Sequence, residues 1–276
     1  MIHYSTNNTT VQIGQAIATV IADTISSDGK RLVTFELVYP RYIHSEVMTH
    51  RVFSRNASSS RATPLSVTLD EVRNDPVFFD YVGKNQAGMV AGEELTDYEH
   101  HVFQEQWNRL GGIVANFVAS LSKDFNIHKQ TLNRALEPWL RIRTLVTATD
   151  WDNFFTLRLA EDAQPEIRSL ALAMKQAMKK SEPKKGDIHL PYITSAELAS
   201  EDVDLLTWVK VSVARCARVS YARHDGKESD VQADIKLHNR LLESGHFSPF
   251  EHIARPALGR CANFDGWRSY RNRLGK

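Results

Sequence analysis

Two β-rich runs stand near the start of the chain. Residues 19–25 and 31–38 are rich in β-branched and aromatic side chains, and they flank an Asp28-Gly29 pair. Because Asp-Gly favours the tight turn of a hairpin, the pattern predicts two antiparallel strands. Apolar residues spaced about one turn apart in residues 43–51 then predict a short helix.

A long helix is predicted between Asp97 and Asp124. Apolar residues recur there mostly three or four positions apart, which is the spacing of one helical face. We expect this face to pack on the core, although Gly111 and Gly112 interrupt it. Its members are Phe103, Trp107, Leu110, Val114, Phe117 and Leu121.

A further strand is predicted at residues 142–149, followed by two helices in series within residues 150–180. Asp150 is the expected N-cap of the first helix, and Pro165 interrupts the pair. Two more helices are predicted near residues 203–219 and 230–244, with a turn-like segment after them. The alternation of strands and helices favours an α/β protein of the α+β kind, with a mixed sheet flanked by long helices.

One stretch separates these elements into two groups. Residues 181–192 (SEPKKGDIHLPY) are rich in Pro, Lys and Gly and show no periodicity, so they are the best linker candidate. We therefore expect a first segment at 1–180, a linker at 181–202 and a second segment at 203–276.

Composition narrows the class of protein. The chain has 276 residues, 42% of them hydrophobic, and 34 Lys and Arg against 33 Asp and Glu. That balance excludes a global basic field for nucleic acid, so any anion site must be local. No apolar run of membrane-spanning length and no signal peptide is visible, and we expect a cytoplasmic protein without a membrane partner.

The two cysteines, Cys216 and Cys261, are too few for a disulfide framework and favour a reducing compartment. Neither has the sequence context of an activated nucleophile, and a buried structural thiol is the expected role of both. The sequence contains no dinucleotide-binding GxGxxG and no P-loop.

A donor-rich stretch, residues 49–62 (THRVFSRNASSSRA), is the strongest sign of function. Arg and Asn forks with Ser hydroxyls suit phosphates and the edges of heterocycles, which indicates an anion or nucleotide site. A solvated polar loop is the alternative, because Ser and Asn also form turns. Residues 245–252 (GHFSPFEH) carry two histidines and a glutamate, but their spacing matches no common metal site, and we predict none.

Three motifs together resemble the flavin-dependent thymidylate synthases (ThyX). The run from His50 to Arg61 is similar to that family's RHRxxSxNxxSxR signature, with Thr49 in place of the first arginine. Residues 245–252 resemble its GHxSPFEH element, and residues 153–168 (NFFTLRLAEDAQPEIR) resemble its NFLxLRxxxxAQxEIR element.

The order of the motifs departs from the family pattern. In the family the GHxSPFEH element precedes the arginine signature, whereas here it follows by almost two hundred residues, as though the chain were permuted or duplicated. Arg271 and Arg273 stand where a second copy of the signature would fall. The arrangement is similar to a rearranged branch that we associate with bacteriophages.

The resemblance implies a fold, an activity and roles. It implies a ThyX-like fold whose two segments form one composite catalytic domain, and reductive methylation of dUMP to dTMP with FAD, methylenetetrahydrofolate and NADPH. Arg158, near the pyrimidine, and His246 are the implied catalytic residues. The implied FAD contacts are His50, Arg51, Ser54, Asn56, Asn153, His246, Ser248, Glu251 and Arg271. The implied substrate contacts are Ser59, Ser60, Arg61, Arg134 and Arg158.

The family also implies a homo-oligomer such as a tetramer, because its sites lie between subunits. Two departures leave alternatives open. Ala57 replaces an acidic residue, and Thr147-Ala148-Thr149 replaces an Asn-x-Arg pair. The alternatives are a related flavoenzyme for another pyrimidine nucleotide and a non-catalytic nucleotide- or flavin-binding homologue.

Overall fold

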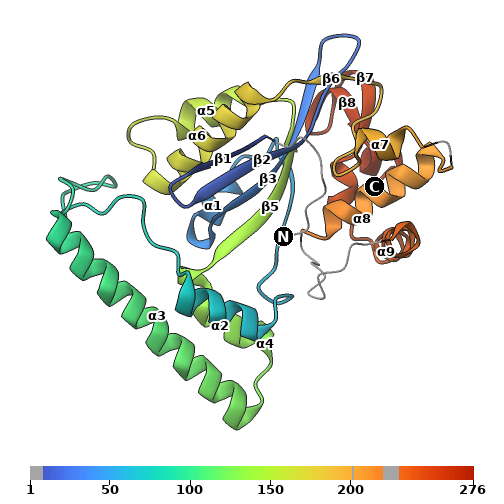
Figure 1. Cartoon of the computed structure of the whole chain (residues 1–276). Helices are drawn as coiled ribbons and strands as arrows, with labels where there is room; N and C mark the ends of the chain where they lie inside the picture. The colour runs from blue at the N-terminus through green and yellow to red at the C-terminus, as the bar shows by residue number, and fades with distance from the viewer. Residues whose placement is uncertain (1–8, 201, 220–229) are drawn as a thin grey trace.

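The computed structural model describes residues 9–200, 202–219 and 230–276. A six-stranded sheet forms the centre of the molecule (Figure 1). Its strands run in the order β1-β2-β3-β5-β4, and β6 pairs in parallel with β2. The strands are β1 (Thr10–Ile13), β2 (Ala16–Ile25), β3 (Arg31–Pro40), β4 (Ser54–Ala57), β5 (Arg141–Ala148) and β6 (Lys184–Lys185).

The predicted hairpin is confirmed. Strands β2 and β3 pair antiparallel, and the turn between them closes with a hydrogen bond from Gly29 N to Ser26 O. Gly29 has φ of +76°, a conformation that costs glycine little because it has no Cβ. The predicted strand at 142–149 is also confirmed as β5.

Two layers cover the sheet. Helices α5 (Asp152–Arg158) and α6 (Pro165–Lys180) lie on one side of it, and the C-terminal elements lie on the other (Figure 1). The C-terminal elements are α7 (Ser195–Leu198), α8 (Leu205–Ala217), α9 (Val231–Glu243), η3 (Ser248–Glu251), β7 (Ala254–Cys261), β8 (Phe264–Ser269) and α10 (Tyr270–Arg273).

The predicted helix starts are partly corrected. Pro165 does separate α5 from α6, as the first residue of α6. Asp150 is not the N-cap of α5, because Trp151 holds that position without a side-chain cap. The Asp150 carboxylate instead binds Arg260 of β7 at 2.5 Å. The expected helix at 43–51 is shorter, with η1 at Arg41–Ile43 and α1 at His44–Val47.

The segment expected to be a linker packs against the sheet. β6 pairs with the end of β2, and the side chain of His189 is fully buried. Leu145 of β5 also belongs to the apolar cluster that contains Trp208 and Phe250. The C-terminal segment therefore shares its core with the sheet.

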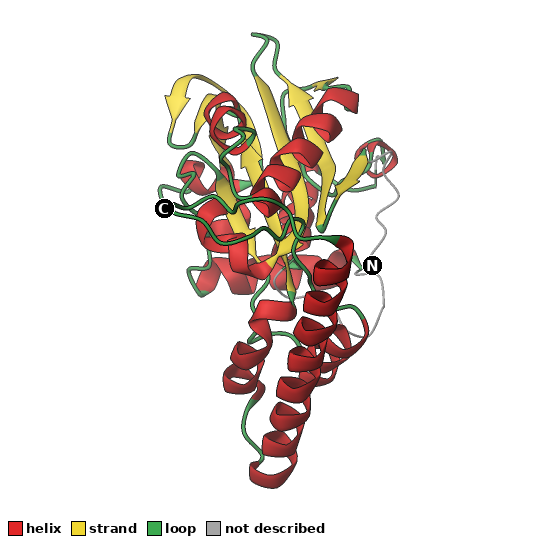
Figure 2. Ribbon diagram, turned by 90° about the vertical axis from the view of Figure 1, so that its left-hand side faces the viewer, coloured by secondary structure: helices red, strands yellow, loops and turns green. Residues whose placement is uncertain are grey.

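Below the sheet, a group of helices extends as an arm (Figure 2). We define the helical arm as α2 (Leu65–Asn74), α3 (Asp97–Phe125), α4 (Lys129–Leu132) and η2 (Asn133–Trp139). The predicted long helix is confirmed as α3. Gly111 lies so close to Trp139 that a Cβ there would fall 2.9 Å from the indole nitrogen, which explains one glycine in its middle.

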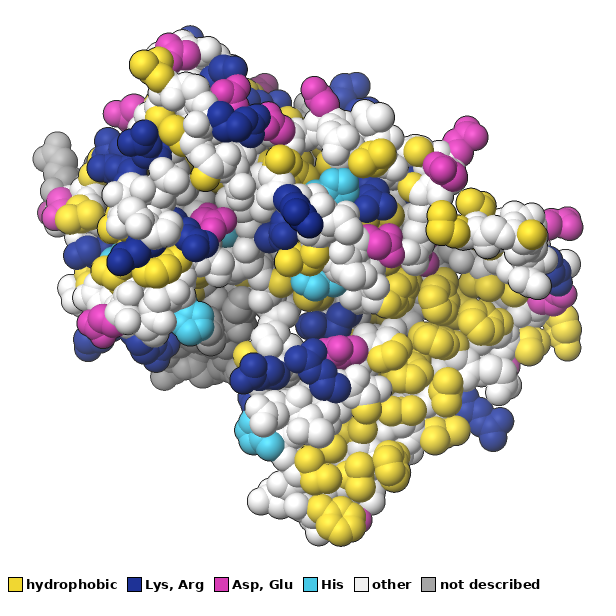
Figure 3. Space-filling view, turned by 180° about the vertical axis from the view of Figure 1, so that it is seen from behind, with side chains coloured by type: hydrophobic (Ala, Val, Ile, Leu, Met, Phe, Trp, Pro, Cys, Tyr) yellow, Lys and Arg dark blue, Asp and Glu magenta, His cyan; other side chains and the backbone are white. Residues whose placement is uncertain are grey.

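The prediction of which side of α3 faces the core is partly wrong. Leu110 and Phe117 are 48% and 63% exposed, whereas Gly111, Ala115 and Val118 are buried against the rest of the arm. Both faces of the helix carry apolar residues, so periodicity alone could not choose between them. The exposed face forms the yellow area over the arm in Figure 3.

Candidate active site

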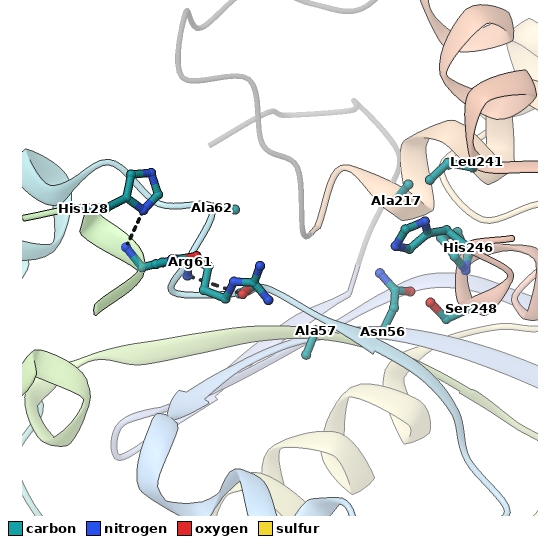
Figure 4. Close-up of a pocket in the computed structure, with 12 residues that line it drawn as sticks. Asn56, Ala57, Arg61, Ala62, His128, Ala217, Leu241, His246 and Ser248 are labelled. Carbon is teal, nitrogen blue, oxygen red and sulfur yellow. Dashed lines mark hydrogen bonds between the residues drawn. The ribbon is translucent and has the colours of Figure 1, made fainter. Parts of the chain in front are cut away.

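A cavity of about 510 Å³ lies between the donor-rich stretch and the C-terminal segment (Figure 4). The loop after β4 and the start of α4 form one side, and the C-terminal ends of α8 and α9 with the start of η3 form the other, next to Asn56 of β4. Predicted site residues from both motifs line it. They are Asn56, Ser59 and Arg61 from the first motif, and His246 and Ser248 from the second.

The charged and polar groups face this cavity from opposite sides. In Figure 4, Arg61 lies on the side of His128, and His246 lies near Asn56 and Ser248 on the other side. Arg61 is exposed, and its guanidinium has no carboxylate within 4.0 Å among the described residues. An exposed guanidinium beside Ser59 and an imidazole is a donor set suited to an anion.

Ser60 and Arg134 lie outside the lining of this cavity, joined by Glu137. The buried Ser60 hydroxyl donates to Glu137 Oε1 at 2.8 Å. Arg134 donates to the same oxygen at 2.9 Å, and the guanidinium of Arg41 lies 3.8 Å from it. One carboxylate therefore holds three of the donors next to the cavity.

His50 and Arg158 form a second group. Arg158 Nε donates to His50 Nε2 at 2.9 Å, and Arg158 Nη2 donates to Thr49 Oγ1 at 3.1 Å. The His50 ring packs edge-on against Phe154 at a centroid distance of 4.8 Å. Burial, with the neighbouring Arg158 and Arg55 charges, lowers the pKa of His50 to about 4, so its imidazole is neutral near pH 7.

Thr49 replaces the family's first arginine at this group. Its hydroxyl donates to the Glu46 carbonyl at 2.6 Å and accepts from Arg158. An arginine at position 49 would bring a second guanidinium beside Arg158, whereas the threonine offers an acceptor. Arg51 and Asn153, two more of the implied flavin contacts, are exposed, and no described residue makes a side-chain hydrogen bond to either.

Glu251 and Arg271 form a third group. They make an ion pair of 2.5 Å, and the Arg271 guanidinium also lies 5.8 Å from the centre of the Phe247 ring. Both line a cavity of about 210 Å³ that also contains Ser54. The Ser54 hydroxyl accepts from Asn263 of the C-terminal segment at 3.2 Å. The predicted flavin contacts are thus distributed over three groups within one chain.

A chain of buried hydrogen bonds connects the main cavity to the sheet. Asn56 Nδ2 donates to the Cys216 carbonyl at 3.1 Å, and Asn56 Oδ1 faces His252 Nε2 at 2.5 Å. His252 Nδ1 lies 2.7 Å from Thr147 Oγ1, and Thr147 Oγ1 lies 2.7 Å from Thr34 Oγ1. His252, Thr147 and Thr34 are fully buried.

The same chain continues through a second histidine. His189 Nε2 lies 2.7 Å from Thr34 Oγ1, and His189 Nδ1 lies 2.8 Å from Thr24 Oγ1. Burial lowers the pKa of both His189 and His252 to about 3, so both rings are neutral. We call these linked groups, from Asn56 to Thr24, the buried polar chain.

The Asn56 amide sets the direction of every bond in the buried polar chain. A carbonyl only accepts, so the amide nitrogen faces Cys216 and the amide oxygen faces His252. His252 therefore carries its proton on Nε2, and its Nδ1 accepts from the Thr147 hydroxyl. Each of these hydrogen bonds therefore has a single donor-to-acceptor direction.

The remaining three bonds follow in the same way. The Thr147 hydroxyl proton is used, so Thr34 donates to Thr147, and His189 donates from Nε2 to Thr34. Thr24 then donates to His189 Nδ1. Each buried polar atom of these links has a hydrogen-bond partner. This avoids the free-energy cost of leaving buried polar groups unsatisfied.

Thr147 and Thr149, which replace the family's Asn-x-Arg pair, have a structural role. Thr147 binds His252, and the Thr149 hydroxyl accepts from the backbone N–H of Asp265 at 3.0 Å. Both threonines therefore hold the C-terminal segment to the sheet. Sequence reasoning missed His252, although it is the last letter of the GHFSPFEH element, because nothing in the motif indicates which strand it meets.

Cys216 is buried, as expected, and burial raises the pKa of its thiol well above the ordinary range. Cys261 is half-buried in β7. Among residues 9–200, 202–219 and 230–276, no group of three or more His, Cys, Asp or Glu side chains is placed to hold a metal ion. The described helices include none with the length and apolar character needed to cross a bilayer.

Comparison with known families agrees with the motifs. The model of the thymidylate synthase complementing proteins (Thy1) matches residues 31–184, which is more than half of the chain. The chain therefore belongs to this family, that of the flavin-dependent thymidylate synthases. The matched region includes the first and third motifs and ends before the C-terminal segment.

The solved structures that the chain matches include ThyX from Helicobacter pylori with FAD and dUMP. It shares 20% identity over 53% of this chain and 67% of that chain, with a TM-score of 0.36. The UMP/dUMP methylase PolB from Streptomyces cacaoi bound with 5-Br UMP shares 15% identity over 60% and 89%, with a TM-score of 0.46. No curated protein matches the chain.

Proposed function

We propose that the protein is a flavin-dependent thymidylate synthase that reductively methylates dUMP to dTMP, with methylenetetrahydrofolate as carbon donor and NADPH as reductant. One observation carries the proposal. The main cavity unites Asn56, Ser59 and Arg61 of the first motif with His246 and Ser248 of the second, although almost two hundred residues separate the motifs.

The donor set fits FAD and a nucleotide together. Arg51 and Arg61 are exposed arginines without a carboxylate partner among the described residues, as a phosphate-binding site requires. We assign Ser59 and Arg61, which line the main cavity, to the nucleotide phosphate, whereas Ser60 and Arg134 are bound to Glu137 outside its lining. We assign to FAD the residues His50, Arg51, Ser54, Asn56, Asn153, His246, Ser248, Glu251 and Arg271. When bound, FAD supplies the hydride that the methylation consumes.

Arg158 has the features of a residue that stabilises developing charge. His50 and Thr49 fix its guanidinium from two directions, so little reorganisation accompanies the reaction. The lowered pKa leaves the His50 ring neutral near pH 7, and the bond donated by Arg158 Nε makes Nε2 the acceptor nitrogen. We propose that Arg158 faces the uracil carbonyl on which negative charge develops, with His246 at the flavin edge.

A homo-oligomer would complete this site. Arg158 is not among the residues that line the main cavity of its own chain. The helical arm also exposes an apolar stripe along α3, formed by Val102, Leu110, Ile113 and Phe117. An exposed apolar stripe of this kind usually marks an interface. We propose that a second copy covers it and brings its own Arg158 to the cavity.

A second candidate rests on Ala57, which lines the main cavity where the family has an acidic residue. Loss of a carboxylate beside the substrate changes which base edges can be bound, because a carboxylate only accepts hydrogen bonds. A flavoenzyme that methylates another pyrimidine nucleotide is therefore the alternative.

One assay distinguishes the two. The purified protein is examined for the visible absorbance of a flavin and then assayed for tritium release from C5-labelled dUMP, UMP and dCMP with methylenetetrahydrofolate and NADPH. Release from dUMP supports the proposal, and release from another nucleotide alone supports the alternative. Protein that stays colourless after incubation with FAD and releases no tritium overturns both.

A substitution connects the activity to the cavity. Arg61→Ala should raise the KM for dUMP about tenfold or more, since a charge-assisted bond to phosphate is lost. Arg168→Ala on α6 is the matched control, because Arg168 is exposed and lines none of the described cavities. An unchanged KM in Arg61→Ala removes Arg61 from the substrate site.

A further inference from the structure

A second cavity of about 320 Å³ lies on the C-terminal segment, between the start of α8 and the β7-β8 hairpin. It shares no lining residue with the main cavity. Its apolar side is formed by residues such as Leu206, Val209 and Ile253, and three arginines line it as well: Arg255, Arg268 and Arg273. Its volume is at the lower end of the range for small-molecule sites.

These three arginines differ from their neighbours in the same segment. Arg215 and Arg218 bind Asp234, Arg260 binds Asp150, and Arg271 binds Glu251. By contrast, Arg255, Arg268 and Arg273 have no carboxylate within 4.0 Å in the part of the chain that the structure describes. Three arginines without an ion pair among the described residues therefore line this one cavity.

The hairpin itself makes the contrast sharper. At its far end, Arg260 stands directly opposite Asp265, which is an attractive cross-strand pair. At the end that lines the cavity, Arg255 stands directly opposite Arg268. Like charges directly opposite each other destabilise a strand pair, and no described carboxylate offsets this repulsion. An anion bound between the two guanidinium groups would offset the repulsion.

We propose that this cavity is a binding site for a small organic anion with an apolar body, such as an aromatic carboxylate, sulfonate or phosphate ester. The guanidinium forks of Arg255 and Arg268 can each bind two oxygens of such a group. The apolar side of the cavity takes the body of the ligand and excludes water, which strengthens the ion pairs. The proposal is independent of the flavin chemistry.

The experiment compares two fluorescent probes on the full-length protein. 1-Anilinonaphthalene-8-sulfonate has an aromatic body and one sulfonate, and N-phenyl-1-naphthylamine has the same body without the charge. We expect the sulfonate to bind at about one site per chain and about tenfold or more tightly than the neutral probe, as charge-assisted bonds predict. Equal affinities for the two probes would overturn the proposal.

Arg268→Glu locates the site without threatening the fold. The variant replaces a like-charge cross-strand pair by an opposite-charge pair, so its melting temperature should rise by roughly 1–3 °C. Its affinity for the sulfonate should fall about tenfold or more, and its affinity for the neutral probe should change less than about twofold. Retained sulfonate binding in this variant would place the probe elsewhere and refute the site.

Arg240→Ala is the matched control. Arg240 is an exposed arginine of α9 with no ion pair among the described residues, and it lines none of the described cavities. Sulfonate affinity should stay within about twofold, because removing one distant surface charge changes only screened interactions. A loss as large as that of Arg268→Glu would mean that net charge, rather than the cavity, attracts the probe.

Discussion

The two ends of the donor-rich stretch are held in different ways. At the His50 end, the partners are Arg158 and Phe154, which belong to the region matched by the family. At the Asn56 end, the partners are Cys216 and His252, which lie beyond it. The first end is complete within residues 31–184, and the second depends on the C-terminal segment.

The difference shows what each end can tolerate. The Arg158 guanidinium is partly exposed, and water can replace a lost partner there. His252 and Thr147 are fully buried, so a lost partner would leave polar atoms without water or protein. Changes at the first end should therefore affect activity more than stability, and changes at the second end should affect stability first.

The largest effect is expected from Arg158→Ala. Tritium release from C5-labelled dUMP should fall by about two to three orders of magnitude, because a fixed guanidinium stabilises charge that develops in the transition state. Circular dichroism should be unchanged. Arg168→Ala should keep its rate within about twofold, and a loss of less than about tenfold in Arg158→Ala would contradict the assigned role.

The second effect tests stability at the Asn56 end. His252→Ala should lower the free energy of unfolding by about 3 kcal/mol in urea titrations, because it removes two buried hydrogen bonds and leaves Asn56 and Thr147 unsatisfied. Thr49→Ala is the comparison at the His50 end, where we expect a loss of about 0.5–1 kcal/mol. Equal losses would mean that the two ends do not differ.

The sequence predicted the central strands better than the contacts of the donor-rich stretch, for a physical reason. Hydrophobic alternation and the Asp-Gly turn are local signals, and they located β2, β3 and β5. The contact of His252 with Asn56 spans 196 residues, and no local pattern encodes it. The first motif indicated that Asn56 matters, but nothing singled out His252, because the partner of Asn56 depends on how the C-terminal segment packs.

The prediction of which face of α3 is buried was wrong for another reason. Two apolar stripes share one helix, and burial of one or the other depends on what lies beside it. Asp150 was a plausible cap by residue type, yet a cation from β7 competes for its carboxylate. In both cases a tertiary contact decided between two local options.

The third prediction concerns pH. Burial holds the pKa of His189 and His252 at about 3, below the ordinary value of 6.5. Below about pH 6.5 the unfolded chain therefore binds more protons than the folded one. The free energy of unfolding should therefore decrease as the pH is lowered. The decrease is up to about 1.4 kcal/mol per pH unit for each histidine, and it ends when the pH reaches the pKa of the folded state.

Urea titrations between about pH 7 and pH 5 measure this slope, above the range in which most carboxylates titrate. His189→Gln removes one of the two groups, so its slope should be shallower by up to about 1.4 kcal/mol per unit. Thr49→Ala should keep the slope of the parent protein. A slope that His189→Gln leaves unchanged would show that His189 is not buried and neutral.

The smallest effect is expected from Arg271→Ala. The pair with Glu251 is partly exposed, with the two side chains 39% and 19% accessible, so its loss should cost less than about 1 kcal/mol of stability. If Arg271 contacts the flavin, FAD affinity measured by calorimetry should nevertheless fall several-fold. Unchanged FAD affinity would assign Arg271 a structural role alone.

The buried polar chain also has a consequence for the nascent chain during its synthesis. Thr147 and its partner His252 are 105 residues apart. At typical synthesis rates of about 5–20 residues per second, the threonine leaves the ribosome roughly 5–20 s before the histidine. Hairpins form within about 1–10 μs. The central strands can therefore pair long before their buried hydroxyls meet a partner, and in that interval water must solvate the face that the C-terminal segment later covers.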